Sequence, residues 1–457
     1  MKSLRLLLRF LTVGGLVLLL LIPLLMIRGL IHDREQYRAQ AVERVAQSMA
    51  GPQQLVGPLR VVPWKGSRRV NVAGEDGRIE ARQELVEGYL LQAPSRLDAG
   101  GAIVPDVRRI GLYDVRVFQW QGQVDAQFGP MELPRVDGRE YGEPYLVLGL
   151  GDVRGLVGTP SLQADGRALE LQPGAMALEG KMHGVHARLP SGDGAEAPAR
   201  ALEASRIALK MTLAGTQSLD IVPVADSNHI ALQSSWPHPL FGGRFLPNER
   251  SIDAGGFRAA WNISSLASAA QTQLQAGDLR LARPAGGGSG YDGDVAGIDS
   301  VQLSLVDPVD VYTQADRASK YGILFVVLTF VGFALFELVK RLRIHPLQYL
   351  LVGLALAIFF LLLLGLSEHV AFWRAYVVSA AACIGLQFVY LSGVLKSWWR
   401  AGAFAVALTA LYGALYSLLV SEDNALLMGS LLLFGVLAGI MWVTRRIDWY
   451  ERAAQLG

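Results

Sequence analysis

Phe10 to Ile27 (FLTVGGLVLLLLIPLLMI) is an uncharged run of 18 residues that follows three basic residues at the N-terminus. About 18 or more apolar residues are enough for a helix to cross the hydrocarbon core of a bilayer. A cleaved signal peptide would have a shorter apolar stretch followed by small residues, whereas this run ends in Met26-Ile27-Arg28. We therefore predict an uncleaved signal anchor over residues 1–31.

The C-terminal third of the chain repeats this pattern. Five further apolar runs, each near the roughly 20 residues that a spanning helix needs, are Tyr321–Val339, Leu347–Leu366, Ala375–Leu395, Ala401–Val420 and Ala425–Val443. The sequence therefore predicts a five-helix transmembrane bundle over 321–445, a tail over 446–457, and six transmembrane helices in total.

The connecting loops predict the orientation of these helices. Basic loops alternate with loops that contain no Lys or Arg. The basic loops hold Lys340-Arg341 with Arg343, Lys396 with Arg400, and Arg445-Arg446, and the others are Ser367-Glu368-His369 and Ser421-Glu422-Asp423-Asn424. Loops rich in Lys and Arg stay in the cytoplasm. Both termini are therefore expected in the cytoplasm, and residues 32–320, with net charge −5 against +7 for the two ends, outside it.

The composition agrees with a membrane protein. The chain is 51% hydrophobic and only 18% charged, whereas soluble proteins carry about 25% charged residues. These values argue against an ordinary cytosolic enzyme, and nothing in the sequence suggests a nucleic-acid partner.

The segment outside the membrane has the pattern of a β domain. Residues 32–50 contain good helix formers and end at Gly51-Pro52, which predicts a juxtamembrane helix. From 51 to 320 short alternating runs are separated by Gly, Pro and Asp, which is typical of an antiparallel β-sandwich, with a joint between two lobes near 189–198. The expected class is an α+β membrane protein. Strands are predicted at 79–91, 115–120, 145–150, 168–171, 206–213, 219–224, 229–235 and 301–305.

Motifs that carry chemistry are weak. His183 and His186 are three residues apart and would face opposite sides of a strand, and Asp292, Asp294 and Asp299 lack the register of a calcium loop. The sequence has neither a G-x-S-x-G elbow nor a P-loop before a helix. We therefore predict no catalytic residue, no metal and no cofactor, and a chain that is not an enzyme.

Three pairs of residues are candidates for an interaction surface. Trp236 and His238 lie in a proline-fixed segment, SWPHPLF, that either presents a recognition surface or packs as a rigid corner. Asp152 and Arg154 form either a ligand site or a turn with a local contact. Trp449 and Tyr450 either anchor the chain at the membrane surface or bind a cytoplasmic partner.

Four residues are candidates for a function within the bundle: Glu337, Glu368, His369 and Gln387. Intramembrane charges are functional candidates by default, but Glu337 lies four residues before Arg341, as in a helical ion pair. Gly435 and Gly439 form a G-x-x-x-G motif that favours close helix packing, within the bundle or in a dimer. Cys383 is the only cysteine and is expected to pack.

The chain resembles the CreD family of bacterial inner-membrane proteins, also described as cell envelope integrity proteins. The resemblance lies in seven segments: SMAGPQQLVGPL (48–59), RIGLYDV (109–115), GDVRG (151–155), SWPHPLFGGRFLP (235–247), 317–337, 345–369 and IDWY (447–450). It implies a multi-pass protein of the inner (plasma) membrane of Gram-negative bacteria, with a periplasmic domain and control by the CreB/CreC two-component system. It further implies a link to envelope integrity and colicin tolerance, and no known enzyme activity.

Three hypotheses follow for the function. The first is a non-enzymatic scaffold that binds the lipid bilayer and an envelope or inner-membrane protein such as a sensor kinase; a homo-oligomer stays open. The second is a transporter of a lipid-linked or small solute, with Gln387, Thr409, Tyr412 and Ser417 facing a shared path. The third is an envelope enzyme centred on His238.

Overall fold

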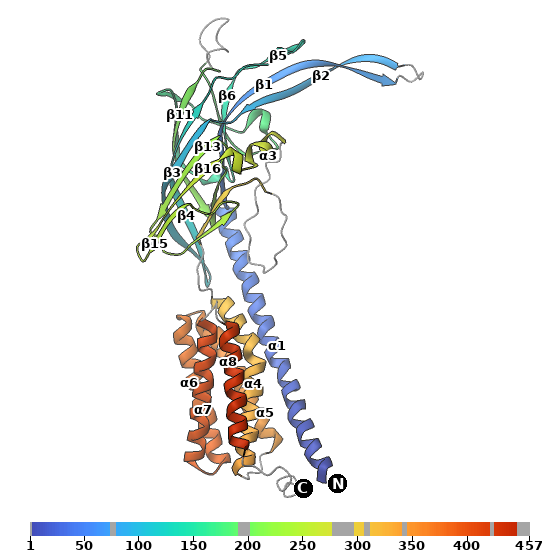
Figure 1. Cartoon of the computed structure of the whole chain (residues 1–457), viewed down its shortest axis with the longest axis vertical. Helices are drawn as coiled ribbons and strands as arrows, with labels where there is room; N and C mark the ends of the chain where they lie inside the picture. Colours follow the sequence, from blue (N-terminus) through green and yellow to red (C-terminus); the bar gives the residue numbers. More distant parts are fainter. Residues whose placement is uncertain are drawn as a thin grey trace. The chain divides into compact units, whose positions relative to one another are not determined.

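The computed structural model describes residues 2–73, 79–190, 202–276, 297–305, 311–340, 345–420 and 425–445. The chain divides into two compact units, a helical unit (1–39 and 309–457) and a β unit (40–308). Helix α1 contributes to both units (Figure 1). Most of the expected joint at 189–198 and the tail 446–457 lie outside the described residues.

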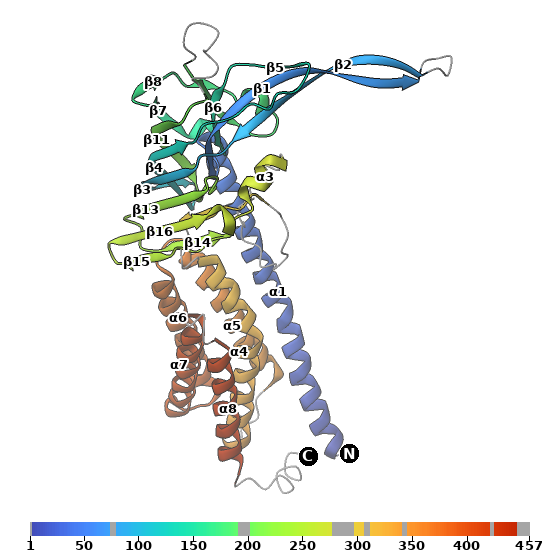
Figure 2. The ribbon, with the colours of Figure 1, turned by 45° about the horizontal axis from the view of Figure 1, so that its top comes forward.

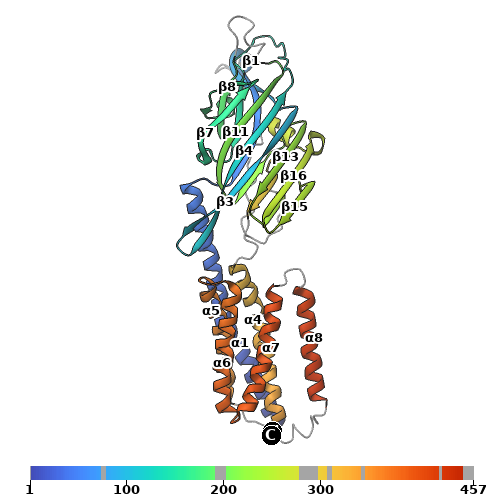
Figure 3. The same cartoon turned by 90° about the vertical axis from the view of Figure 1, so that its left-hand side faces the viewer.

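The helical unit consists of the apolar helices that the sequence predicts. They are α1 (Lys2–Ser48), α4 (Val311–Lys340), α5 (Pro346–Ser367), α6 (Phe372–Val394), α7 (Trp398–Val420) and α8 (Ala425–Thr444) (Figure 3). Within the described residues the first five are long and apolar enough to span a membrane, and α8 contains a shorter apolar stretch, Leu427–Trp442. The run expected from Tyr321 belongs to a helix that already begins at Val311.

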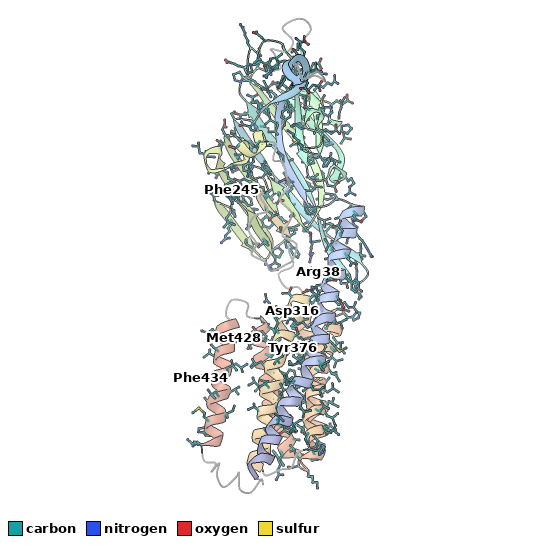
Figure 4. The ribbon with its side chains drawn as sticks, turned by 90° about the vertical axis from the view of Figure 1, so that its right-hand side faces the viewer. Arg38, Phe245, Asp316, Tyr376, Met428 and Phe434 are labelled. Atoms are coloured by element: carbon teal, nitrogen blue, oxygen red, sulfur yellow. The ribbon has the colours of Figure 1, made fainter. Side chains whose placement is uncertain are left out.

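Aromatic side chains fill the centre of this unit. Phe359 packs edge-on against both Tyr376 and Tyr412, with ring centroids 5.4 and 4.7 Å apart. Tyr376 lies on α6 and faces into the bundle (Figure 4). α8 packs differently, because its described side chains are all at least partly exposed, including Phe434 at 70%. Lipid can solvate such apolar faces, which water cannot do.

The β unit contains two sheets. In the described residues sheet A consists of β1 (Gln53–Ala73), β2 (Ile79–Gln92), β5 (Arg139–Tyr141), β6 (Tyr145–Leu150), β9 (Gln172–Pro173), β10 (Gly184–Arg188), β12 (Ser218–Ile221), β14 (Pro239–Gly243) and β17 (Val301–Leu305). Sheet B consists of β3 (Arg96–Ile110), β4 (Tyr113–Phe128), β7 (Leu156–Ala164), β8 (Arg167–Leu169), β11 (Ser205–Thr216), β13 (Ser227–Ser234), β15 (Glu249–Asp253) and β16 (Gly256–Ser264).

Two strand pairs correct the expectation of a purely antiparallel domain. β1 pairs with β12, and β3 pairs with β13, in parallel. Parallel neighbours need a long connection, and here many residues separate the two strands of each pair. Periodicity within one strand shows which face is buried but not which distant strand lies beside it.

Side chains from both sheets form one hydrophobic core. Trp120 on β4 and Trp261 on β16 are fully buried in it, and Trp261 donates a hydrogen bond to the carbonyl of Phe245 at 3.1 Å. A short helix, α3 (Ala270–Ala276), adds Ala270 and Leu274. The alternation at Ile207, Leu209, Met211 and Leu213 is confirmed, because all four are buried.

β1 and β2 extend beyond the rest of sheet A as a two-stranded ribbon (Figure 2). Residues 67–73 of β1 pair with 79–85 of β2, and no other described strand pairs with either segment. We call these two segments the β-ribbon. An isolated two-stranded ribbon is marginally stable in water, so its conformation depends on how its base is held.

Candidate functional site

One cluster of candidate residues joins the end of α1 to the strands of the β unit. Asp152 and Arg154 form an ion pair at 2.6 Å, and Arg154 also donates to the carbonyls of Ala46 and Gln47 in the last turn of α1. A cation is favourable at a helix C-terminus, where carbonyls lack intrahelical partners. The local Asp/Arg contact expected from the sequence is present, and it additionally caps a helix about 100 residues earlier in the chain.

Asp152 connects this cap to the chain that follows α1. Its Oδ2 accepts from the backbone N–H of Gly51, and its Oδ1 from the backbone N–H of Arg154, both at 3.1 Å. Burial raises the pKa of Asp152, but these donors and the Arg154 guanidinium outweigh burial and hold the pKa below its usual value. Asp152 is therefore an ionised anchor at neutral pH.

Buried polar side chains extend this junction. Thr216 donates to the carbonyl of Ala50 at 2.7 Å, and Gln53 donates to the carbonyls of Ala214 and Asp152. On the helix itself, Ala41 and Val45 are buried in a small cluster with two valines of β4, Val115 and Val117. The junction is thus held by both packing and hydrogen bonds.

The base of the β-ribbon is fixed by a second cluster. Arg60 on β1 is fully buried, and it donates to the side chain of Gln92 at 2.9 Å and to the carbonyl of Glu203 at 3.0 Å. Burial lowers the pKa of Arg60 to about 10. Farther along, the Arg139 guanidinium lies 3.9 Å above the ring of Trp64, and a Cβ at Gly88 would be 2.4 Å from that ring.

Trp236 and His238 meet at the surface of the β unit. Their rings are edge-on with centroids 5.7 Å apart, Trp236 Nε1 donates to the His238 carbonyl, and the Arg116 guanidinium stacks 4.0 Å over the Trp236 ring. His238 is exposed and Trp236 partly buried against the core. Leu240 nearby in sequence is 58% exposed. The segment therefore forms a rigid corner that leaves His238 and Leu240 exposed and the Trp236–Arg116 stack partly exposed.

A buried carboxylate that the sequence analysis did not single out lies in sheet A. Asp220 on β12 is 3% exposed, and burial raises its pKa to about 7, against the opposing hydrogen bond from Gln302. Asp220 is the polar member of the apolar run LDIVPV. A single acidic residue within an apolar run predicts a buried carboxylate, since the residues of such a run are expected to be buried. This pattern is the sequence signal that could have identified Asp220.

The candidate metal ligands do not come together. His186 is buried and its Nδ1 lies 2.9 Å from the carbonyl of Gly174, while His183 is exposed. Asp299 accepts from the backbone N–H of Ala269. Asp292 and Asp294 lie outside the described residues, within which no group of three or more His, Cys, Asp or Glu could hold a metal ion.

One end of the helical unit carries a charged cluster. Glu368, which follows α5, is 8% exposed and pairs with Arg34 of α1 at 3.4 Å and with the hydroxyl of Tyr312 at 3.5 Å. A second pair joins Arg28 to Asp316 at 3.7 Å. Asp316 lies near one end of α4 (Figure 4). His369 is exposed in the same connection. The cluster connects α1 to α4 and to the α5–α6 connection.

Gln387 lies in the interior of the helical unit. It is 2% exposed, and among the described residues neither its amide oxygen nor its amide nitrogen has a hydrogen-bond partner. Tyr412 is buried as well. Thr409 is exposed and bonds to Ala405, and Ser417 bonds to Ala414, each within its own helix. Of the four side chains proposed for a shared path, Gln387 and Tyr412 are thus buried, Ser417 is partly exposed and Thr409 is exposed.

Three remaining candidates cannot be placed. Trp449 and Tyr450 lie outside the described residues, and only the backbone of Glu337, in α4, is described.

Comparison with known proteins decides the family. The sequence profile of the family described as "Inner membrane protein CreD" matches residues 5–450. The chain belongs to the CreD family. A CreD relative, "Inner membrane protein CreD" of Escherichia coli (strain K12), is 36% identical over 438 residues, covering 95% of this chain and 92% of the relative. The CreD match includes both the helical and the β unit.

Among solved structures, the crystal structure of the M1 zinc metallopeptidase from Deinococcus radiodurans overlaps 37% of this chain and 38% of its own, with 11% identity and a TM-score of 0.20. A score this low shows no common fold, and the metallopeptidase says nothing of the CreD chain.

Proposed function

We propose that this CreD-family chain is a non-enzymatic scaffold of the inner membrane, whose β unit binds an envelope or inner-membrane protein in the periplasm. The β-ribbon is the observation that carries the proposal. Its two strands have unpaired outer edges in the described residues, and free strand edges are templates for pairing with another chain. Leu85, within the ribbon, is 70% exposed.

The base of the ribbon supports a role in binding. The buried Arg60 and the Trp64–Arg139 stack hold the two strands where they leave the sheet. A binding element that is held in place before it meets its partner loses less conformational entropy on association. A sensor kinase is one partner that the family resemblance suggests, together with roles in envelope integrity and colicin tolerance.

The proposal includes the topology predicted from the sequence: six spans, both termini in the cytoplasm, and a β-sandwich in the periplasm. Cysteine accessibility tests it in a chain whose single native Cys383 is replaced by Ser. Ser251→Cys, in exposed β15, should react with a membrane-impermeant maleimide in intact spheroplasts, whereas Lys396→Cys, exposed between α6 and α7, should react only after lysis. The reverse pattern contradicts the topology.

Site-specific photo-crosslinking in cells tests the scaffold. A photoreactive residue at position 85 should give a discrete adduct, and one at Ile252, 47% exposed on β15, should not. A chain in which a tight turn replaces residues 67–85 should insert and fold but lose envelope function. Absence of the adduct, identical adducts at both positions, or full function without the ribbon would each contradict the scaffold.

A transporter is the second candidate, because the polar atoms of the Gln387 side chain have no partner among the described residues of the helical unit, where such atoms cost several kcal/mol. Unchanged solute flux in Gln387→Leu would remove it. An envelope enzyme centred on His238 is the third, and wild-type envelope function in His238→Ala would argue against it.

A further inference from the structure

β12 lies between the first and the last described strand of the β unit, β1 and β17. On one side it pairs with β1, which begins at Gln53 shortly after α1 ends at Ser48. On the other side it pairs with β17, which ends at Leu305 shortly before α4 begins at Val311. β12 therefore joins the two strands through which the chain enters and leaves the β unit.

The attachment of β12 to β1 is short. The parallel pairing covers only Gln53–Leu55 of β1 and Leu219–Ile221 of β12. Among the described strands, β17 and β14 reach the remainder of sheet A through β12. A change that weakens β12 would thus loosen the β12–β17–β14 edge without breaking a strand pair of sheet B.

One row of polar side chains crosses this attachment. The register pairs Gln54 with Asp220 and Asp220 with Gln302. Within the part of the chain that the structure describes, Asp220 Oδ1, both polar atoms of the Gln54 side chain and the hydroxyl of Ser218 have no hydrogen-bond partner, although all three residues are at least 97% buried. The remaining oxygen, Asp220 Oδ2, accepts one long bond from Gln302 at 3.5 Å.

This environment favours a neutral carboxylic acid. The side chains that face Asp220 from β1, β17 and its own strand are Gln54, Gln302 and Ser218, and none of them titrates or carries a charge. No charged group of the described chain contributes to the raised pKa of Asp220, which burial causes. A protonated acid has an O–H to donate to Gln54, whereas an ionised one is a buried charge without a cation.

We propose that Asp220 is a proton-operated latch: the neutral acid keeps β12 joined to β1 and β17, and loss of its proton loosens this edge of the β unit. The latch responds to the pH of the compartment that holds the β unit. It goes beyond the scaffold proposal and does not depend on it.

Hydrogen–deuterium exchange of the full chain in lipid nanodiscs tests the latch. Amide protection of 218–221 and 301–305, corrected for intrinsic exchange, should fall about tenfold or more between about pH 5.5 and about pH 8.5, since one pKa unit corresponds to a tenfold change in an equilibrium. In Asp220→Asn the protection should no longer depend on pH. Asp114→Asn, a 64% exposed carboxylate on β4, should behave as wild type.

Several outcomes overturn the latch. They are constant protection in the wild type, or an unchanged pH dependence in Asp220→Asn. Restoration of protection by added Ca²⁺ at the higher pH would show a cation site in place of a proton site. If Asp220→Asn does not fold, the Asp carboxyl ¹³C signals of the wild type decide, because one of them must titrate near neutral pH; titration of every Asp below about pH 5 contradicts the latch.

Discussion

Replacement of Asp152 by Asn tests the junction between α1 and the β unit. The carboxylate accepts from Gly51 N and Arg154 Nη2 through Oδ2, and from the N–H and Nε of Arg154 through Oδ1. In Asn one of these oxygens becomes an NH₂ group. The two donors that bonded to this oxygen then face an NH₂ group, which cannot accept a hydrogen bond. The negative charge that pairs with the guanidinium is also lost.

The expected cost follows from these contacts. A charge-assisted hydrogen bond contributes about 1.5 to 3 kcal/mol, and a backbone N–H left unsatisfied costs about 1 to 3 kcal/mol when buried. Arg154 is 54% exposed, so solvent weakens the charged part. We expect Asp152→Asn to lower the free energy of unfolding of the β unit by about 2 to 3 kcal/mol.

The chain supplies a matched control. Arg96 and Asp98 are also two residues apart, and the Arg96 guanidinium donates to both Asp98 oxygens, at 2.9 and 3.4 Å. This pair lies on β3, where Arg96 is exposed and Asp98 partly exposed, and none of its hydrogen bonds within the described residues reaches the end of a helix. Asp98→Asn should cost less than about 1 kcal/mol, as exposed pairs do.

Urea unfolding of the solubilised chain measures the global change, and trypsin cleavage after the exposed Arg44 in α1 measures local opening. The depressed pKa of Asp152 means that its contribution is present above the unfolded-state value of about 3.9 and is lost as the pH falls through the folded-state pKa. Asp152→Asn should therefore remove part of the acid sensitivity. Equal costs for the two variants, or unaltered cleavage after Arg44, would refute this account of the junction.

Asp220→Asn should have the opposite effect to Asp152→Asn and raise the free energy of unfolding by about 4 kcal/mol above pH 7. This value is the difference between the folded-state pKa of about 7 and the ordinary value of 3.8, converted at about 1.4 kcal/mol for each pKa unit. The benefit should vanish below about pH 4 in urea titrations, because a raised carboxyl pKa costs nothing where both states are protonated; a pH-independent benefit would disprove it. Glu368→Gln should lower the thermal midpoint in detergent, and a double-mutant cycle with Arg34→Gln should give a coupling of about 0.5 to 3 kcal/mol; additive effects would mean that the pair contributes nothing. Gly101→Ala should prevent folding of the β unit, because its Cβ would be 2.1 Å from a carbonyl of β4, whereas Gly111→Ala, with positive φ but open space around it, should cost about 1 kcal/mol by circular dichroism melts; comparable losses would be inconsistent with the packing.

The sequence predicts the helical unit well, because an apolar run of about 20 residues predicts a membrane-spanning helix. Each of the predicted runs lies in an observed helix, except that Leu395 follows the last residue of α6, and α4 begins ten residues earlier than expected, at Val311. Its first turns contain Asp316 and Arg317, so hydropathy could not mark where the helix begins.

Short strands with alternating residues are also predicted, as at Tyr145–Leu150 and Val301–Leu305, which match the observed strands. β1 was missed because Pro58, Pro63 and two glycines interrupt its pattern. Proline is tolerated at the edge of a sheet or at a bulge, and the register of β1 does shift between Val56 and Leu59. Because different parts of β1 pair with different strands, its buried residues do not follow a single alternating pattern along the strand.

The candidate site illustrates the same limit. The GDVRG motif predicts a turn with an Asp/Arg contact, and both are present. The partners of that contact, Ala46 and Gln47, are distant in sequence and offer only backbone carbonyls. Carbonyls carry no side-chain signature, so the cap on α1 could not be read from residue types.

β1 contributes both to the β-ribbon and to the hydrophobic core, and this double role restricts where the chain can change length. Side chains alternate between faces along β1, so one residue added before Leu59 would turn every core position after it outward. Residues added in equal number to both strands beyond the Ser67–Leu85 pair would lengthen the ribbon and leave the packed half of β1 in phase. Variation in reach is thus confined to the far end, where it does not disturb the interior.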